Sequence, residues 1–438
     1  MDGSGSGKSA SYSIPNAHQC LGSYVFTDPK GELYDRTAGY LKEHGYDIKV
    51  LNLVRPQYSD GYNPLMHISS ELDVDVIANT IVKGQKTDSG SDPYWDDMAE
   101  MLLKALIYYL IATRPEEEQN LASCAELVRA ANKNGGSNLL SDLMSQLPYD
   151  HPARMYYKSI EIAPEKTYGS ILSSLQSKLG KFDSKDIAEL TSTDTINFEE
   201  IGSKKTAVYV ISSDTHTAYD FLLTIFFSQM IQQLYDYADQ NGGRLKERTY
   251  FILDEFANIG QIPQFEKLIA TIRSREISAS IILQSQSQLK AIYKDAAEII
   301  LDNADSTLFL GGRGKNAKDI SENLGRETID SFNTSENRGT QVSHGLNYQK
   351  LGKELMTQDE IAVMDGGKCI LQLRGVRPFF SDKYDITQHP NYKYLSDFDK
   401  KNAFDVERYM STRPAIVKPD EPFDIYEIDL SDEDAAAE

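Results

Sequence analysis

A glycine-rich turn near the start of the chain carries the first residues whose types and spacing could do chemistry. The run Gly3-Ser4-Gly5-Ser6-Gly7-Lys8-Ser9 ends in Gly-Lys-Ser and precedes a plausible helix. Backbone N–H groups of such a turn point at the β- and γ-phosphates of a nucleotide. Lys8 would neutralise phosphate charge, and the Ser9 hydroxyl would ligate Mg²⁺ beside ATP. The predicted phosphate-binding residues are Gly5, Ser6, Gly7, Lys8 and Ser9.

This turn departs from the full pattern G-x-x-x-x-G-K-[ST], because the first glycine position holds Asp2. A buried strand precedes such a turn in P-loop proteins, and no strand-like run precedes it here. We therefore expect the natural protein to begin upstream, with this chain truncated at its N-terminus. The alternative is a flexible Gly/Ser leader that only resembles the motif.

A second candidate is the run Tyr250-Phe251-Ile252-Leu253-Asp254-Glu255, in which a buried strand leads into two carboxylates. This is a Walker B pattern. Asp254 would hold Mg²⁺ through its water shell, and Glu255 would polarise the attacking water. The alternative is a strand that ends in two solvated acids.

A third candidate is Gln284, which follows the next apolar run, Ile281-Ile282-Leu283. A polar side chain there could sense the γ-phosphate, or it could cap a helix. Between the two carboxylates and Gln284 lie Arg273 and Arg275. Either arginine could reach into a neighbouring subunit's site as a finger on the transition-state charge, or both could belong to a solvated basic face.

Buried strands alternate with helical patterns along much of the chain. Runs rich in Ile, Val and Leu between helices indicate a parallel sheet covered on both faces, so we predict an α/β fold. The predicted strands cover residues 24–28, 48–53, 206–211, 250–254, 280–284, 307–310 and 369–373.

One region contains only helical patterns. They cover residues 96–111, 124–132, 137–146, 152–160 and 168–182. We therefore predict an inserted all-α domain at 92–184 that divides a nucleotide-binding domain into parts 1–91 and 185–382. Residues 383–438 are predicted to be irregular. The last 19 residues carry nine acidic and no basic side chains, which is typical of disorder.

Composition limits the class of protein. Hydrophobic residues at 40% and charged residues at 25% are typical of a soluble folded chain. A net charge of −21 argues against a surface that coats nucleic acid, although a few basic loops could still line a pore. No apolar run reaches the roughly 20 residues of a membrane-spanning helix. Three scattered cysteines give neither a disulfide framework nor metal-ligand spacing, which fits a reducing cytoplasm.

Taken together, these residues resemble the conjugative coupling ATPases of type IV secretion, the TraG/TraD-like family. The most specific segments are Asp28-Pro29-Lys30-Gly31-Glu32-Leu33 and Asp254-Glu255-Phe256-Ala257-Asn258. They lie within the resembling segments 26–33 and 253–258, and the other resembling segments are residues 3–9, 282–285 and 311–313, in the family's order. The sequence departs from the family pattern in the membrane anchor, the first strand and the first P-loop glycine.

The resemblance implies a RecA-like P-loop NTPase that works as a homo-hexamer and hydrolyses ATP with Mg²⁺. Its implied substrate is single-stranded DNA with a bound relaxase, delivered to components of the type IV secretion channel. N-terminal transmembrane helices would tether the full-length protein to the cytoplasmic face of the bacterial membrane, whereas this chain alone would be soluble and cytoplasmic. By position, Arg273 matches the family's trans-acting arginine better than Arg275 does.

Three alternatives remain open from the sequence. A double-stranded DNA translocase of the chromosome-segregation type shares the fold, but the helical insert and the D-P-K-G-E-L segment argue against it. A non-catalytic docking module could recruit substrate through the helical insert. The cargo could also be protein rather than DNA.

Overall fold

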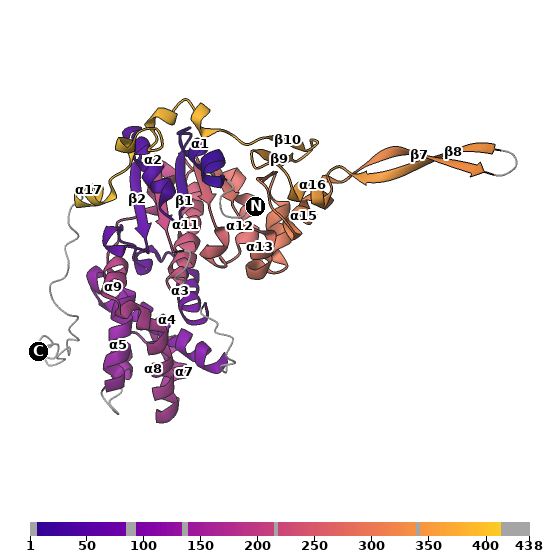
Figure 1. Ribbon diagram of the computed structural model, residues 1–438. Helices are drawn as coiled ribbons and strands as arrows, with labels where there is room; N and C mark the ends of the chain where they lie inside the picture. The colour runs from indigo at the N-terminus through magenta and orange to yellow at the C-terminus, as the bar shows by residue number, and fades with distance from the viewer. Residues whose placement is uncertain (1–6, 85–92, 134–138, 214–217, 339–341, 413–438) are drawn as a thin grey trace, which may run out of the picture. The chain divides into compact units, whose positions relative to one another are not determined.

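Helices and strands form where the sequence places apolar residues at helical or alternating spacing. The computed structural model describes residues 7–84, 93–133, 139–213, 218–338 and 342–412 (Figure 1). Gly5, Ser6 and the acidic tail lie outside the described residues. The chain divides into two units, each assembled from separate stretches of sequence.

The first unit comprises Met1–Thr27, Glu32–Tyr46 and Arg248–Phe404. Its strands are β1 Ser23–Thr27, β4 Thr249–Leu253, β5 Ile277–Ile281, β6 Ser306–Phe309, β7 Arg326–Arg338, β8 Val342–Glu354, β9 Lys368–Leu373 and β10 Phe379–Asp382. Its α-helices are α1 Ile14–Ala17, α2 Glu32–Glu43, α12 Phe265–Thr271, α13 Gln286–Tyr293, α14 Ala296–Asp302, α15 Lys315–Leu324 and α16 Gln358–Ala362. A π-helical turn, η1 Ser9–Ser13, precedes α1, and the short 3₁₀ turns are η6 Phe256–Ile259, η7 Ile272–Arg275, η8 Ile386–Gln388, η9 Tyr392–Tyr394 and η10 Lys400–Asn402.

The second unit comprises Asp28–Gly31, Asp47–Glu247 and Asp405–Glu438. Its strands are β2 Asp47–Asn52 and β3 Thr206–Ile211. Its α-helices are α3 Glu71–Lys83, α4 Pro93–Thr113, α5 Leu121–Lys133, α6 Leu139–Ser145, α7 Pro152–Glu161, α8 Glu165–Leu179, α9 Lys185–Ser192, α10 Phe198–Ser203, α11 Asp220–Gln240 and α17 Val406–Ser411. Its 3₁₀ turns are η2 Pro56–Tyr58, η3 Pro64–His67, η4 Glu116–Glu118 and η5 Gly180–Asp183.

In the described part of the chain, one sheet has five strands in the order β2-β3-β1-β4-β5. The pairs β1–β4, β4–β5 and β2–β3 are parallel, as predicted. In the first unit, Thr27 pairs with Leu253 and Leu253 pairs with Ile281. Because these three strands are parallel and in register, the residues that follow β1, β4 and β5 emerge at one edge of the sheet.

Two predicted strands belong elsewhere. The runs at 307–310 and 369–373 form β6 and β9, which pair antiparallel with each other in a three-stranded sheet of order β10-β9-β6. The expectation that they extend a parallel sheet was wrong. A short apolar run does not encode strand direction, which here follows from the route of the chain between β6 and β9.

A long ribbon was not predicted at all. Strands β7 and β8 pair antiparallel along 13 residues each, from Arg326 opposite Glu354 to Arg338 opposite Val342. Figure 1 shows this ribbon, in orange, extending away from α15 and α16.

The helical region of the second unit has a buried ionic contact where its apolar helix α4 carries Lys104. The Lys104 ammonium lies 2.8 Å from Oδ1 of Asp75 and 2.8 Å from Oε1 of Glu100. Lys83 lies 2.8 Å from the other oxygen of Glu100. Two lysines therefore neutralise this carboxylate and lower its pKa, although burial acts in the opposite direction. Lys104, which interrupts the apolar run of α4, is thus paired with Asp75 of α3.

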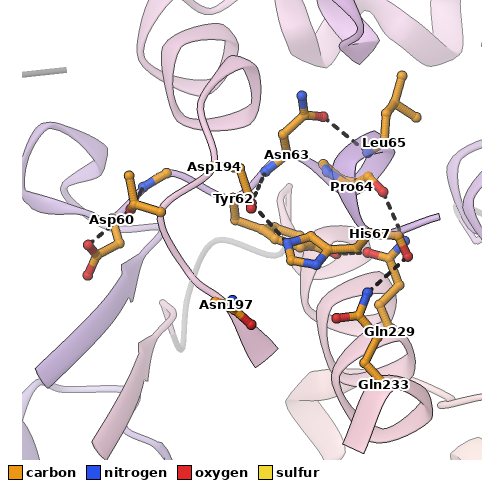
Figure 2. Close-up of polar contacts among 12 residues, drawn as sticks. Asp60, Tyr62, Asn63, Pro64, Leu65, His67, Asp194, Asn197, Gln229 and Gln233 are labelled. Carbon is orange, nitrogen blue, oxygen red and sulfur yellow. Dashed lines mark hydrogen bonds and ion pairs between the residues drawn. The ribbon is translucent and has the colours of Figure 1, made fainter. Parts of the chain in front are cut away.

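A buried polar cluster lies where the chain passes from β2 into the helical region and returns from it (Figure 2). Nε2 of His67 lies 2.9 Å from Oδ1 of Asp194, which also accepts the backbone N–H of Asn63 at 3.1 Å. The Tyr62 hydroxyl donates a 2.6 Å hydrogen bond to Oε1 of Gln229 on α11, and Nε2 of Gln229 donates to the Pro64 carbonyl at 2.9 Å. The two ends of the helical region are thus joined to each other and to α11.

Among the described residues, no helix combines the length and apolar character needed to cross a membrane. The domain boundaries at 91, 184 and 382 stay a prediction, because the two units do not test them.

Candidate functional site

The glycine-rich turn leads directly into the first helical turns. Gly7 has a φ of +81°, a left-handed conformation that glycine adopts without a Cβ clash. Its carbonyl accepts the N–H of Ser11 at 2.7 Å, which closes the first turn. Lys8 and Ser9 therefore lie at the start of a helical stretch that continues through η1 and α1.

The Lys8 side chain faces the end of β4. Its Nζ lies 3.3 Å from Oε1 of Glu255 and 3.5 Å from Oδ1 of Asp254. All three side chains are largely buried, with exposed fractions of 13% for Lys8, 16% for Asp254 and 18% for Glu255. One cation thus lies against two carboxylates in a partly desolvated site, where charge interactions are stronger than in water.

Burial raises the pKa of Asp254 above its ordinary value, and the negative charge of Glu255 acts in the same direction. Lys8 opposes this shift because its positive charge favours the ionised carboxylate. The net direction is upward. Asp254 therefore takes up a proton at higher pH than an exposed aspartate does.

The backbone holds the two carboxylates in fixed positions. Glu255 has a φ of +50°, which is uncommon for a residue with a side chain and costs of order 1–3 kcal/mol. Oδ1 of Asp254 accepts the Glu255 N–H at 3.0 Å, and the Asp254 carbonyl accepts the Thr27 hydroxyl at 2.6 Å. Thr27, the last residue of β1, thereby fixes the turn that presents both acids.

Gln284 completes this group from the neighbouring strand. Its Nε2 donates a 2.7 Å hydrogen bond to Oε1 of Glu255. The residue lies at a bend three positions after β5 rather than at the strand end, because β5 ends at Ile281 and not at residue 284 as predicted. Ser285 caps α13, with its side chain accepting the Ser287 N–H. The side chain of Gln284 instead faces the acid.

The predicted finger arginine lies apart from this group. Arg273 is in η7, its side chain is 93% exposed, and it lies 4.0 Å from Asp305. Among the described residues, no contact joins it to Lys8 or Glu255. Arg275 ends the same turn.

Two residues that bond to the backbone of site residues were missed from the sequence. Thr27 lies in the segment 26–33 that resembles the family, but the sequence predicts no role for its hydroxyl. Asn316 donates Nδ2–H to the Gln284 carbonyl at 2.8 Å, and no motif marks it. A polar residue at the end of a central strand next to the Walker B strand is the one signal that could have identified Thr27.

A family profile described as "Type IV secretory system Conjugative DNA transfer" matches residues 1–393. The chain belongs to this family. The predicted family resemblance is therefore confirmed over most of the sequence.

Individual members of the family and their solved structures are similar to this chain at low identity. A conjugal transfer protein TraG from Escherichia coli is 25% identical across 83% of this chain, and a protein VirD4 from Rhizobium radiobacter is 24% identical across 93%. The chain spans 61% and 58% of the lengths of these two relatives.

The bacterial conjugative coupling protein TrwBdeltaN70, in an unbound form, aligns with a TM-score of 0.62 at 16% identity, over 89% of this chain and 84% of that one. A TrwB structure in complex with the ATP analogue ADPNP aligns equally well, with a TM-score of 0.62 over 88% and 84% of the two chains. These likenesses confirm the predicted fold, a RecA-like P-loop fold with a mostly parallel sheet and inserted helices.

Proposed function

We propose that this chain is the ATPase body of a type IV secretion coupling protein, which recruits DNA bound to a relaxase and moves it into the secretion channel. The observation that carries the proposal is the approach of Lys8 and Gln284 to one carboxylate oxygen, Oε1 of Glu255. These residues come from three separate places in the sequence, and their types match the parts of an ATP-hydrolysing site.

The residues present fit ATP with Mg²⁺. Lys8 has three N–H donors and can contact phosphate oxygens while it stays near the two acids. Asp254 offers a carboxylate, and Ser9 follows Lys8 at the start of a helix; such oxygens, with phosphates and water, are the usual ligands of Mg²⁺. TrwB, which shares the fold, has been solved with ADPNP and with ADP and Mg²⁺. Gly5 and Ser6 would complete the phosphate cradle with Gly7.

When bound, ATP supplies a γ-phosphate open to attack by water, and Mg²⁺ offsets the charge that develops on it. Glu255 would hold the attacking water and draw its proton toward Oε1. Gln284 donates to that same oxygen and would therefore respond when the water or the phosphate changes the position of Glu255. Lys8 would hold phosphate charge throughout.

Arg273 would act on a neighbouring copy of the chain. Its exposed side chain in η7 supports this role, because a group that completes another copy's site must reach beyond its own surface. In the assembled motor, a homo-hexamer, loss of the γ-phosphate would loosen the interface between copies.

We further propose that the partners are single-stranded DNA with a bound relaxase and the components of the secretion channel. The full-length protein would be held at the cytoplasmic face of the membrane by N-terminal helices. The family description, which names conjugative DNA transfer by a type IV secretory system, supports DNA as the cargo and the secretion channel as the partner.

The test is ATP hydrolysis by the chain, with and without single-stranded DNA, at concentrations that drive assembly. Lys8→Ala removes the phosphate contact, and Lys185→Ala is the matched control because its side chain is 85% exposed and far along the chain in the other unit. We expect DNA-stimulated turnover in the parent and in Lys185→Ala, and none in Lys8→Ala. Equal turnover in Lys8→Ala and the parent would show that the activity does not come from this site.

A parent that neither binds nor hydrolyses ATP would overturn the motor assignment. Capture of a relaxase by that same protein without nucleotide would then favour a docking module. Stronger stimulation by double-stranded than by single-stranded DNA would favour a translocase of the chromosome-segregation type.

A further inference from the structure

Asn316 contacts the candidate site from helix α15, which contains none of the site residues. Its Nδ2 donates a 2.8 Å hydrogen bond to the backbone carbonyl of Gln284. It lies in the first turn of α15, directly after a loop in which Gly311, Gly312 and Gly314 have φ values of +119°, +159° and +61°. The Gly314 carbonyl, just before α15, accepts Nε2 of Gln358 at 3.3 Å, so the start of α15 is held by the first residue of α16 and, through Asn316, by the site.

One face of helix α15 packs against a single small apolar core. Ala317, Ile320 and Leu324 line one face at helical spacing and are buried against Phe309 of β6, Ile370 of β9 and Ile361 of α16. Close packing of this kind transmits a displacement at one end to the other end. The helix spans ten residues, which is about 15 Å.

The far end of α15 leads straight into the ribbon formed by β7 and β8. Gly325 ends the helix with a φ of +81°, and β7 begins at the next residue. The Ser321 hydroxyl donates to the Met356 carbonyl at 2.7 Å, just beyond the end of β8. The Leu355 N–H donates to the Gly325 carbonyl at 3.1 Å and closes the base of the ribbon. Both strands are thus anchored to the C-terminal half of α15.

The two strands of the ribbon form a sheet of their own. Near its base, Tyr348 is 67% exposed and Leu351 is 48% exposed. A two-stranded ribbon with both edges open has no second layer to hold it in one position. Its direction therefore depends on the helix and turn from which it starts.

We propose that Asn316 is a positioning residue that couples the nucleotide state of the site to the ribbon through α15. The path runs from Oε1 of Glu255 to the side chain of Gln284, and from the Gln284 carbonyl to Asn316. When the contact between Glu255 and Gln284 changes, the backbone of residue 284 shifts and the N-terminus of α15 follows. The ribbon, joined to the other end of the helix, changes its position. This inference rests on the proposed ATPase function.

The chemistry of the contact requires an amide. Asparagine donates N–H to the carbonyl, whereas alanine removes the donor, and aspartate keeps the shape but offers only acceptors when ionised. Both substitutions remove the same hydrogen bond, from Asn316 to the Gln284 carbonyl. Asn303 provides a matched control, because its Nδ2 makes a 2.8 Å bond to the Ile299 carbonyl, four residues earlier in its own helical segment.

The experiment is hydrogen exchange on the full chain, comparing ADP with ADPNP and following peptides from the ribbon base at 326–330 and 348–354. In the parent and in Asn303→Ala, the exchange rates at the base differ between the two nucleotides. In Asn316→Ala that difference falls about fivefold, the factor expected for the loss of one neutral hydrogen bond. Asn316→Asp gives at least the same reduction. The ADPNP dissociation constant of both variants stays within about twofold of the parent, because neither contacts the phosphates.

If Asn316→Ala still binds ADPNP and shows the same exchange difference as the parent, the coupling is overturned and the ATPase assignment stays intact. A parent that binds ADPNP without any change at the ribbon base also overturns it. A parent that binds neither nucleotide overturns the coupling and the proposed function together. Ser321→Ala removes the bond from α15 to the Met356 carbonyl beyond β8 without touching the site and provides a second arm: an unchanged exchange difference at 348–354 contradicts the anchoring of β8 through Ser321.

Discussion

Nε2 of Gln284 and Nζ of Lys8 approach the same oxygen, Oε1 of Glu255, at 2.7 and 3.3 Å. A single carboxylate oxygen therefore receives a neutral donor from the turn after β5 and a cation from the glycine-rich turn. Any change that alters the charge or position of Glu255 alters both contacts at once, so this oxygen is the natural place to test the site.

Glu255→Gln should separate binding from turnover. The substitution keeps the size of the side chain but removes the charge and the basic oxygen, while Lys8 and Asp254 remain to hold nucleotide and metal. We expect the ADPNP dissociation constant to change by less than about threefold and ATP turnover to fall by about 10²-fold or more. Fluorescence titration and a phosphate-release assay measure the two quantities. Turnover at the parental rate would show that Glu255 is not the general base.

Arg273→Ala should act on a neighbouring copy. Loss of a finger arginine costs about 10³-fold or more in rate. A mixture of Arg273→Ala and Glu255→Gln chains provides a sharper test, because an Arg273→Ala copy keeps its own acid and can borrow Arg273 from a Glu255→Gln neighbour. We therefore expect the mixture to hydrolyse ATP faster than either variant alone. Arg248→Ala, which removes an arginine paired with Glu276, is the control for loss of charge on the same unit. A mixture as inactive as its components would contradict sharing of the site.

Tyr62→Phe should destabilise the second unit. The Tyr62 ring is fully buried, and its hydroxyl is a donor to Gln229, which is 1% exposed. Without that hydroxyl, Oε1 of Gln229 is left buried without this donor, at a cost of about 1–3 kcal/mol in the free energy of unfolding. Urea unfolding followed by circular dichroism measures the difference. Tyr149→Phe is the matched control, since Tyr149 is 72% exposed, and its unfolding midpoint should stay parental. Equal midpoints for Tyr62→Phe and the parent would rule out a structural role for the hydrogen bond.

Stability should fall in mild acid because of His18. Burial, with a smaller contribution from His389, lowers the pKa of His18 from 6.5 to about 4. The folded state therefore disfavours the protonated form. The contribution of neutral His18 to the free energy of unfolding is fully present above pH 6.5. It is lost as the pH falls toward 4, and the loss reaches about 3 kcal/mol.

His18→Phe keeps an aromatic ring on Tyr40, with which His18 stacks at 4.2 Å, and removes the titrating group. Unfolding free energies of the parent and the variant, measured at several pH values between 4 and 8, should diverge only below about pH 6.5. An equally steep acid loss in His18→Phe would assign the pH dependence to other groups.

Much of the fold could be predicted because apolar runs mark buried strands directly. The strand at 206–211 has the predicted bounds, and the pattern at 152–160 gave α7 almost residue for residue. The strand leading to Gln284 was placed three residues late, because β5 is Ile-Ser-Ala-Ser-Ile and its start is set by pairing with β4 rather than by hydrophobicity. Tertiary pairing of this kind leaves no local signal.

The ribbon and Asn316 were missed for related reasons. The described base of the ribbon pairs Glu327 with Lys353 and Asp330 with Lys350, so it lacks the alternation of apolar and polar residues by which strands are recognised. Asn316 acts through a single bond to a backbone carbonyl, and such a bond depends on the position of Gln284 rather than on any sequence pattern. The residue types of the site were predictable, whereas the element that joins it to the ribbon was not.

The pairing of Lys8 with Glu255 joins residues 247 positions apart in the chain. A ribosome adding about 5–20 residues per second needs roughly 12 to 50 seconds to bring the acid out after the lysine. During that interval the glycine-rich turn has neither of its carboxylate partners, and β1 has no β4 beside it. The nascent protein can therefore assemble its helical region first, and its ability to respond to nucleotide would arise only late in synthesis.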